Sequence, residues 1–579
     1  MPEKEQEVSF KNLFFPFTTL KAINWIIIIG ISVYFIGLFN GFIGDDWGQI
    51  VDNFTVHSIQ NVFNFFLGSS FYVNGAGSFG IYYKPLMMVI YSALYTLFGQ
   101  QPFFYHLTQL FLHIANSCLI FILFKRFFKI KLSFFLSLIF LIHPINSEAV
   151  YYIADMQEVL FFFFGISAFL VISKSKEIRK LFTLGILWLF SLFSKETGVL
   201  FIISSLIYNY LFVKNKYIYF VGGLSVLLYL ILRISTIGIH VNTPDIFIVA
   251  NGNLLDRLSS IPKVISFYIT TFIYPFNITI QQNWLVKSLN FGDFYIPLVI
   301  DSIFFATISY FAAFFKRINK FFIEYLFFLS WFVLGIFLHL QIIPLDAVVS
   351  DRWFYFPIVG LLGMTGIVVT YLLPKIKKEN VKRFLIVFSI VTLIIFSFKT
   401  FIRGYDFSND FTLCSHDEKI DANNYALELC LGNEYRKLRE FDIARLHLKK
   451  SISLFPKYYI AMYYLALSYS DQNNYIEAIK YFRETLSNNT WGYGADQLAT
   501  LLVYHGKYQE SKNIALENLK KQPKNAQLWY ALSIADYMLG DKNEALNAAQ
   551  EAYSLAPNTL TGGVLNAIQK NMPLKFDGK

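Results

Sequence analysis

Two adjacent carboxylates follow the first long apolar segment of this chain. Asp45 and Asp46 stand in the sequence GDDW, residues 44–47. Neighbouring carboxylates repel each other, so one of them holds a proton more tightly than the other. One interpretation is a general base that takes a proton from the hydroxyl of an acceptor. The alternative is a solvated pair that marks the outer end of a helix, and composition alone leaves both open.

Further polar residues stand at the ends of later apolar segments. The sequence HPINSE contains His143 and Glu148, and SKE contains Lys195 and Glu196. Ionisable residues that border membrane spans are candidates for a functional site by default. For His143 and Glu148 the alternative is a helix that ends at a proline and carries polar caps.

Three cations could meet a phosphate group at the same side of a membrane. Lys84 precedes Pro85, Lys195 ends an apolar segment, and Arg352 stands in SDRWFYFP. Arginine binds phosphate through two parallel N–H donors. Each cation alone fits a boundary charge, but together with the two carboxylates they predict a site for a phosphorylated lipid.

The elements that must position these residues are membrane helices. The chain has 579 residues, of which 55% are hydrophobic and only 15% charged, whereas soluble proteins have about 25% charged residues. This composition excludes an ordinary soluble enzyme and a disordered chain. We expect about 11 spans: 22–43, 103–124, 132–149, 157–173, 181–194, 197–213, 217–234, 296–315, 321–343, 354–373 and 384–402.

Two further apolar stretches are expected to lie along the membrane surface. Residues 86–98 number only 13, and a span needs about 20. The stretch 261–276 is interpreted in the same way. If 261–276 crosses the membrane instead, all later loops are inverted.

The charge distribution predicts the orientation. Residues 403–579 contain 20 Lys and Arg and 20 Asp and Glu, so the basic excess lies in residues 1–402, with 29 against 19. Basic residues between spans mark cytoplasmic loops, which excludes a nucleic-acid surface as the cause. The N-terminus is therefore expected in the cytoplasm, and the alternate acidic loops outside. The basic clusters are 125–131, 174–180, 214–216, 316–320 and 375–383.

A repeat of 34 residues begins after the last span. Its period is that of tetratricopeptide repeats, in which small residues stand where two helices touch. Four copies suffice for a stable solenoid, which the topology places outside the membrane. The recurring positions are Leu431, Gly432, Tyr435 and Ala444; Leu465, Ala466, Tyr469 and Ala478; Leu498, Ala499 and Ser511; and Trp529, Leu532, Ser533 and Ala545.

Cysteines and histidines give no metal signature. Three Cys exclude a disulfide scaffold and a zinc site built from Cys, and the His residues lack metal-ligand spacing. Cys414 and Cys430 both fall outside the membrane in this topology and could pair, but the sequence gives no strong reason to assert the bond.

The order of these motifs resembles the GT-C membrane glycosyltransferases, most closely the branch with tetratricopeptide repeats that is related to protein O-mannosyltransferases. The resemblance implies an all-α, polytopic GT-C type helix bundle followed by an α-solenoid. It also implies transfer of a sugar, with inversion, from a polyprenyl-phosphate donor to a hydroxyl of an exported protein or envelope glycan. The motifs that carry it are DDWGQIVDN (45–53), YKPL (83–86), HPINSEAV (143–150), SKETG (194–198), SDRWFYFP (350–357) and the terminal repeats.

The resemblance also implies roles for single residues. Asp45 is expected to be the general base, and Asp46 to position the acceptor, the base or a divalent metal such as Mg or Mn. Lys84, Lys195 and Arg352 are expected to bind the donor phosphate. The substrate-positioning residues are expected to be His143, Glu148 and Glu196.

One position departs from the family pattern. The family often has Arg eight residues after the Glu that corresponds to Glu148, whereas this chain has Met156. If that Arg binds the donor phosphate, this protein needs another cation or recognises its donor differently. The identity of the sugar and of the lipid is therefore left open.

We expect an integral membrane protein of the bacterial inner membrane. Residues 1–402 are predicted to form the transferase domain, with exterior loops 44–102 and 235–295. Residues 403–424 are predicted to be a linker, 425–559 four repeats that hold a protein or glycan acceptor in their groove, and 560–579 a capping segment.

Two other functions are weighed against the transferase. One is a non-catalytic scaffold whose repeats recruit exported proteins, and the other is a transporter of lipid-linked glycans. Transporters usually show broken helices and polar residues near the membrane midplane, for which Asp301 and Glu324 are the remaining signal here.

Overall fold

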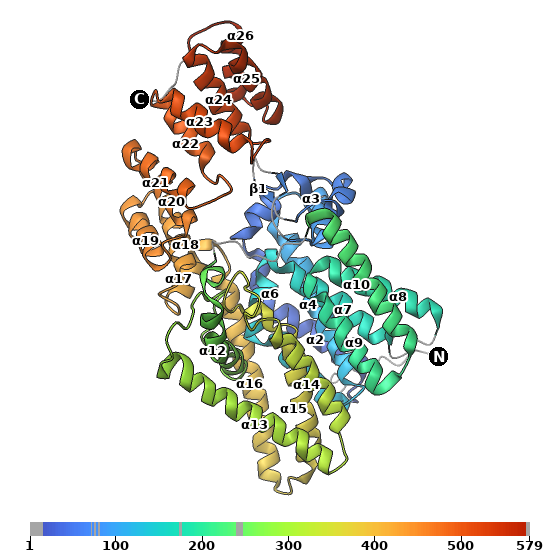
Figure 1. Cartoon of the computed structure of the whole chain (residues 1–579). Helices are drawn as coiled ribbons and strands as arrows, with labels where there is room; N and C mark the ends of the chain where they lie inside the picture. The colour runs from blue at the N-terminus through green and yellow to red at the C-terminus, as the bar shows by residue number, and fades with distance from the viewer. Residues whose placement is uncertain are drawn as a thin grey trace, which may run out of the picture. The chain divides into compact units, whose positions relative to one another are not determined.

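The computed structural model describes residues 16–70, 82–172, 177–238 and 247–574, together with the backbone of two short strands. Helices make up most of these residues (Figure 1). The strands β1 (Tyr72–Val73) and β2 (Gly77–Ser78) form an antiparallel hairpin, and they are the only named strands in the described part of the chain. The expected all-α class is thus confirmed.

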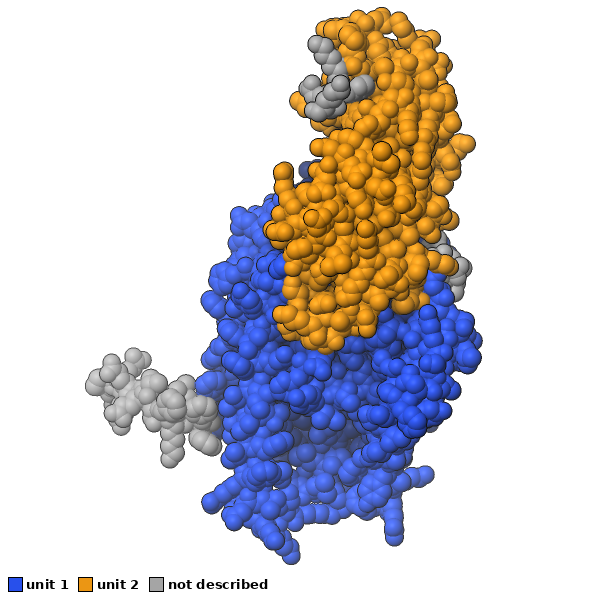
Figure 2. Space-filling view, turned by 90° about the vertical axis from the view of Figure 1, so that its left-hand side faces the viewer, with its two compact units in different colours: residues 1–70, 81–243, 249–413 blue, residues 71–80, 244–248, 414–579 orange. Residues whose placement is uncertain are grey.

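Two compact units divide the chain (Figure 2). The first contains residues 1–70, 81–243 and 249–413, and the second contains 71–80, 244–248 and 414–579. The boundary after residue 413 falls inside helix α17 (Asp410–Glu418). This helix lies in the segment that the sequence analysis treats as a linker.

Eight helical segments of the first unit are long and apolar enough to cross a membrane, counted over the described residues. A ninth is added if the bent pair α5 (Ile130–Ile142) and η5–α6 (Pro144–Tyr151) is one span. The eight are α2 with η1 (Thr19–Phe39), α4 (Pro102–Phe124), η6 with α7 (Ile153–Ile172), η7 with α9 and η8 (Glu196–Val213), α10 (Lys216–Ile237), η9 with α13 (Phe291–Arg317), α15 with η11 (Pro357–Lys375) and α16 (Glu379–Asp406).

The expected number of eleven spans is therefore met only in part. The other two segments form α8 (Ile178–Ser194) and α14 (Phe322–Phe337), with 17 and 16 residues. A helix of that length measures roughly 25 Å, which is shorter than the hydrocarbon core of about 30 Å. Both helices pack on spanning helices, α8 on α7 and α10, and α14 on α15. Their crossing of the membrane stays a prediction.

Helices α14 and α15 approach closely because α15 carries glycines on the shared face. A Cβ at Gly363 would lie 2.1 Å from the ring of Phe328, and one at Gly360 would lie 2.5 Å from the backbone of Phe332. Small residues permit this kind of close helix packing in membranes. The contact matters for the site because α15 begins at Pro357, directly after the SDRWFYF segment.

The two long loops carry the helices that were expected at the membrane surface. The first contains η2 (Trp47–Val51), η3 (Phe54–His57), η4 (Ile59–Phe66) and α3 (Pro85–Phe98), which has 14 residues. The second contains α11 (Ile248–Asn251) and α12 (Leu254–Ile273). Helix α12 is 20 residues long, but the proline Pro262 interrupts it and its composition does not qualify it as a span.

The second unit consists of helix pairs that match the expected repeats. The first pair is α18 (Tyr425–Lys437) and α19 (Phe441–Leu454), and the small residues Ala444, Ala478 and Ala545 are all fully buried in their pairs. The remaining helices are α20 (Tyr459–Ser470) with α21 (Tyr475–Ser487), α22 (Ala495–Tyr504) with α23 (Tyr508–Leu519), α24 (Ala526–Leu539) with α25 (Lys542–Leu555), and the last helix α26 (Thr559–Gln569).

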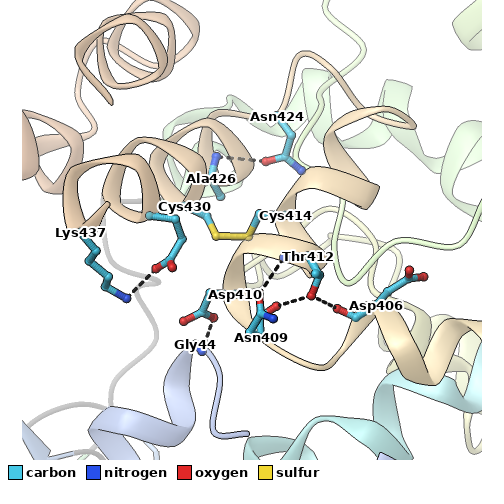
Figure 3. Close-up of a disulfide and its surroundings, with 11 residues drawn as sticks. Gly44, Asp406, Asn409, Asp410, Thr412, Cys414, Asn424, Ala426, Cys430 and Lys437 are labelled. Carbon is cyan, nitrogen blue, oxygen red and sulfur yellow. Dashed lines mark hydrogen bonds and ion pairs between the residues drawn. A yellow bond between two sulfur atoms is a disulfide. The ribbon is translucent and has the colours of Figure 1, made fainter. Parts of the chain in front are cut away.

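A disulfide joins Cys414 of α17 to Cys430 of α18 (Figure 3). The sequence alone does not determine whether these two cysteines pair. The two residues are 16 positions apart, and only the folding of two consecutive helices against each other brings their sulfur atoms together. Cys414 packs in the same buried cluster as Leu427 and Leu431.

Candidate active site

The two adjacent carboxylates have different surroundings. Asp46 is fully buried, and its two carboxylate oxygens accept hydrogen bonds from the backbone N–H of Ile43 at 3.0 Å and of Ala154 at 2.7 Å. The side chain of Asp45 is exposed and accepts no hydrogen bond from the described residues. Asp46 thus ties the loop to the start of α7, whereas the Asp45 carboxylate is accessible.

The backbone around Asp45 is fixed from other elements. The N–H of Asp45 donates to the hydroxyl oxygen of Tyr152 at 2.7 Å, and the N–H of Gly44 donates to the carboxylate of Asp410 at 2.7 Å. Gly44 has φ +47°, and a Cβ there would lie 2.6 Å from the Tyr152 hydroxyl. Glycine is therefore required at this turn, and the carboxylate of Asp45 projects from a rigid loop.

The pKa of each carboxyl group is raised. For Asp45 the main cause is desolvation by the surrounding protein; Arg352 and Lys84 act in the opposite direction, and Asp346 raises the pKa further. Burial raises the pKa of Asp46 well above its usual range, against the lowering effect of its two backbone hydrogen bonds.

Arg352 lies among three carboxylates. Its Nη1 is 2.8 Å from Glu148 Oε1 and 3.4 Å from Asp155 Oδ2, and its Nη2 is 3.6 Å from Asp346 Oδ2. The side chain is 12% exposed, that of Asp346 32%, and those of the other two acids 3% or less. The Asp346 contact is thus the longest and the most open to solvent.

Glu148 holds the segment that carries Arg352. Its carboxylate accepts hydrogen bonds from the Ser350 hydroxyl at 2.9 and 3.0 Å and from the backbone N–H of Arg352 at 2.8 Å, in addition to the guanidinium. With all these donors and 2% exposure, the Glu148 side chain is not accessible to a substrate. The expected positioning role can operate only through Arg352.

His143 is not accessible to a substrate either, so the positioning role expected for it would have to be indirect. Its Nδ1 accepts from the backbone N–H of Ile145 at 3.2 Å, so Nε2 is the protonated nitrogen and donates to the Phe272 carbonyl at 3.0 Å. The imidazole is fully buried and stacks on the Phe272 ring. Both nitrogens are used to join the α5–α6 turn to α12, which excludes direct contact with a substrate.

The two lysines lie in the same electrostatic environment. Lys195 forms an ion pair with Glu158, and its side chain is 12% exposed. The ammonium of Lys84 lies 4.4 Å from the centre of the Tyr82 ring. Burial lowers the pKa of Lys84; Glu196 and Asp346 raise it, and Lys195 lowers it further. Glu196 itself is 3.9 Å from Arg233.

The fold therefore brings Arg352 and Lys84 within electrostatic range of Asp45, and Lys195 and Glu196 within electrostatic range of Lys84. Five further residues contact these side chains or the backbone of the Gly44–Asp45 turn and were not expected from the sequence to belong to the site: Tyr152, Asp155, Glu158, Asp346 and Asp410. None of them stands in a pattern that sequence spacing reveals.

The position that departs from the family pattern lies inside this cluster. Met156 is fully buried in the first turn of α7, between Asp155 and Glu158. These two acids are contacted by Arg352 and Lys195. Lys195 thus places a positive charge beside the turn where many relatives of the resembled family would carry Arg.

The donor set does not fit a divalent metal. Among the described residues, no group of three or more His, Cys, Asp or Glu side chains is arranged to hold a metal ion. Both oxygens of Asp46 are occupied by N–H donors. We derive no step through Mg or Mn.

Comparison with known sequences finds a repeat family model and relatives among the protein O-mannosyl-transferases. A tetratricopeptide repeat family model matches residues 430–490 and 497–558. Human protein O-mannosyl-transferase TMTC3 is 32% identical over 161 residues, which are 27% of this chain and 17% of the relative. Caenorhabditis elegans protein O-mannosyl-transferase F38B6.6 is 27% identical over 185 residues, 31% of this chain and 26% of the relative.

Comparison with solved structures gives only distant likenesses. ArnT from Cupriavidus metallidurans bound to undecaprenyl phosphate has a TM-score of 0.35 at 12% identity, over 91% of this chain and 79% of that one. MamA has a TM-score of 0.24 at 17% identity, over 30% and 88%. Both scores are too low to support a conclusion about function.

The chain spans about a quarter or less of the length of the curated relatives named above. The matched tetratricopeptide segments cover the expected repeats, and the helix pairs α18 to α25 confirm them. The chain is thus a helical protein with C-terminal tetratricopeptide repeats, and it has sequence homologues among the protein O-mannosyl-transferases.

Proposed function

We propose that this protein is a membrane glycosyltransferase that moves a sugar from a polyprenyl-phosphate donor to a hydroxyl group of an exported protein or envelope glycan. The observation that carries the proposal is the unequal environment of the acidic pair. Both carboxylate oxygens of Asp46 accept backbone N–H groups. The Asp45 carboxylate, by contrast, is exposed and lies within electrostatic range of Arg352 and Lys84. The protein O-mannosyl-transferase relatives support the reaction class.

In the proposed reaction the acceptor oxygen attacks the anomeric carbon of the sugar. Asp45 takes the hydroxyl proton as the new carbon–oxygen bond forms. The bond between the anomeric carbon and the phosphate oxygen breaks, and the electron pair leaves with the polyprenyl phosphate. A positioned carboxylate base contributes roughly 10²–10⁴-fold to such a step.

The cations stabilise the charge that develops on the leaving phosphate. We propose that the donor phosphate replaces Asp346 at Arg352, because this contact is the longest of the three and Asp346 is the most exposed partner. Lys195 and Lys84 supply further positive charge. The buried acids Glu148 and Asp155 remain bound to Arg352 and hold its side chain in place.

The site and the repeats are proposed to face the exterior of a bacterial inner membrane. The basic loops predict this orientation. The disulfide between Cys414 and Cys430 supports it independently, since disulfides persist in oxidising compartments and are rare in the cytosol. The repeats are proposed to hold the acceptor.

The experiment is sugar transfer by the purified protein from a radiolabelled polyprenyl-phosphate sugar to a crude envelope acceptor. Asp45→Asn should lower turnover by roughly 10²–10⁴-fold while expression and membrane insertion are unchanged. Asp52→Asn is the matched control, because Asp52 is an exposed carboxylate in the same loop. Full transfer by Asp45→Asn would remove the proposed base, and no transfer by the wild-type protein would favour a scaffold.

A further inference from the structure

The loop that presents Asp45 lies along the end of α16 and the start of α17. The side-chain amide of Asn40 donates to the Gly404 carbonyl at 2.9 Å, and the backbone N–H of Gly41 donates to the Ser408 carbonyl at 3.2 Å. In the third contact the Asp410 carboxylate accepts the backbone N–H of Gly44 at 2.7 Å. Segments more than 360 residues apart in the sequence thus determine the path of this loop.

Asp410 is the first residue of α17, and the loop at the start of this helix is well fixed. The Asn409 side chain accepts the N–H of Thr412 at 2.9 Å, and the Thr412 hydroxyl donates to the Asp406 carbonyl at 3.0 Å (Figure 3). A hydrogen bond to a charged acceptor is stronger than one between neutral groups. The Asp410–Gly44 bond therefore favours one conformation of the turn before Asp45.

Two consecutive residues of α17, Leu413 and Cys414, make tertiary contacts. Leu413 is buried in the core cluster that also contains Ile43, Tyr151 and Phe407. The next residue, Cys414, is bonded to Cys430 of the first repeat. A nine-residue helix is too short to be stable alone in water. The position of its first residues, and with it that of Asp410, depends on the packing of Leu413.

We propose that Asp410 is a positioning residue for Asp45, because its carboxylate holds the Gly44 N–H and so keeps the turn before Asp45 in one conformation. Asp410 does not touch the reacting atoms; it acts through the backbone of the Gly44–Asp45 turn. This role rests on the proposed function only in that Asp45 is taken as the base. The geometry of the turn can be measured without catalysis.

The first measurement is amide hydrogen exchange of the segment 41–47 in the full-length protein in detergent micelles. Asp410→Ala removes the acceptor and should raise exchange in this segment at least tenfold. Asp410→Asn keeps an oxygen at the same position and should retain most of the protection. Unchanged exchange in Asp410→Ala, or equal exchange in the two variants, would overturn the positioning role.

Turnover completes the test. Asp410→Ala should lower kcat by roughly 10–10²-fold with little change in KM for the donor, because misplacing a catalytic group by about 1 Å has effects of that size. Asp410→Asn should recover most of the rate. If exchange responds as expected but Asp45→Asn remains fully active, the proposed base is wrong and the positioning of the turn still stands. Full kcat in Asp410→Ala would contradict the catalytic part of the inference.

Discussion

Arg352 and Glu148 form the central ion pair of the candidate site, with 2.8 Å between Nη1 and Oε1. Glu148 comes from α6 and Arg352 from the segment before α15, 204 residues later. Because Glu148 also accepts the backbone N–H of Arg352 and the hydroxyl of Ser350, one carboxylate determines both the side chain and the main chain at the proposed phosphate site.

Removing this carboxylate should destabilise the protein. Glu148→Ala leaves the Arg352 guanidinium and two further donors without their main acceptor, and breaking one half of a buried ion pair costs about 3–5 kcal/mol. We expect a clear fall in melting temperature of the purified protein, measured by intrinsic fluorescence. Asp346→Asn is the matched control, since its 3.6 Å contact is partly exposed. An equal fall in both variants would contradict the central role of Glu148.

Asp346 should compete with the donor for Arg352. Asp346→Asn removes that competition and lowers the local negative charge, so KM for the polyprenyl-phosphate sugar should fall several-fold. The kinetics of sugar transfer at varied donor concentration measure this. A higher KM in Asp346→Asn would mean that the carboxylate helps to bind the donor, and the proposed replacement would be wrong.

The acid limb of the pH–rate profile should follow the pKa of Asp45. A base acts when deprotonated, so turnover should fall as the pH drops through this pKa, which lies above the ordinary range for aspartate. Asp346 raises it and Lys84 lowers it. Asp346→Asn should therefore shift the limb to lower pH and Lys84→Met to higher pH. Shifts in the same direction in both variants would exclude Asp45 as the titrating group.

Lys195 should matter for binding the donor. Lys195→Met removes the charge but keeps the length of the side chain, so donor KM should rise roughly tenfold or more, since a charge-assisted contact contributes about 1.5–3 kcal/mol. Lys263→Met is a control, because that cation pairs with Asp293 elsewhere on the surface. An unchanged KM in Lys195→Met would remove this residue from the phosphate site.

A reporter fused after Lys579 tests the orientation. We expect activity of a periplasmic reporter such as alkaline phosphatase, because the charge pattern places the last span's C-terminal end outside. The control is a fusion in the basic segment 316–320, which is expected in the cytoplasm. A cytoplasmic signal from the C-terminal fusion would overturn the topology and the interpretation of α8 or α14 as spans.

The sequence by itself determined the class of this protein. Apolar segments of sufficient length predict membrane helices, and the 34-residue period predicts the helix pairs, because both are local patterns of burial. The acidic pair, the three cations and the Cys residues are all visible as residue types. The sequence also shows that the apolar stretches of α3 and α8 are shorter than a usual span, whereas the shortness of α14 is seen only in the structure.

Only the tertiary structure decided what each polar residue does. The sequence alone does not distinguish Asp45 from Asp46. In the fold Asp46 is buried and accepts the N–H groups of Ile43 and Ala154, whereas Asp45 is exposed. His143 satisfies both nitrogens within the fold, and the acids Asp155 and Asp346 meet Arg352. Several of these roles depend on contacts between segments far apart in the sequence: 108 residues separate Asp46 from Ala154, 129 separate His143 from Phe272, and 197 separate Asp155 from Arg352. No local periodicity encodes such contacts.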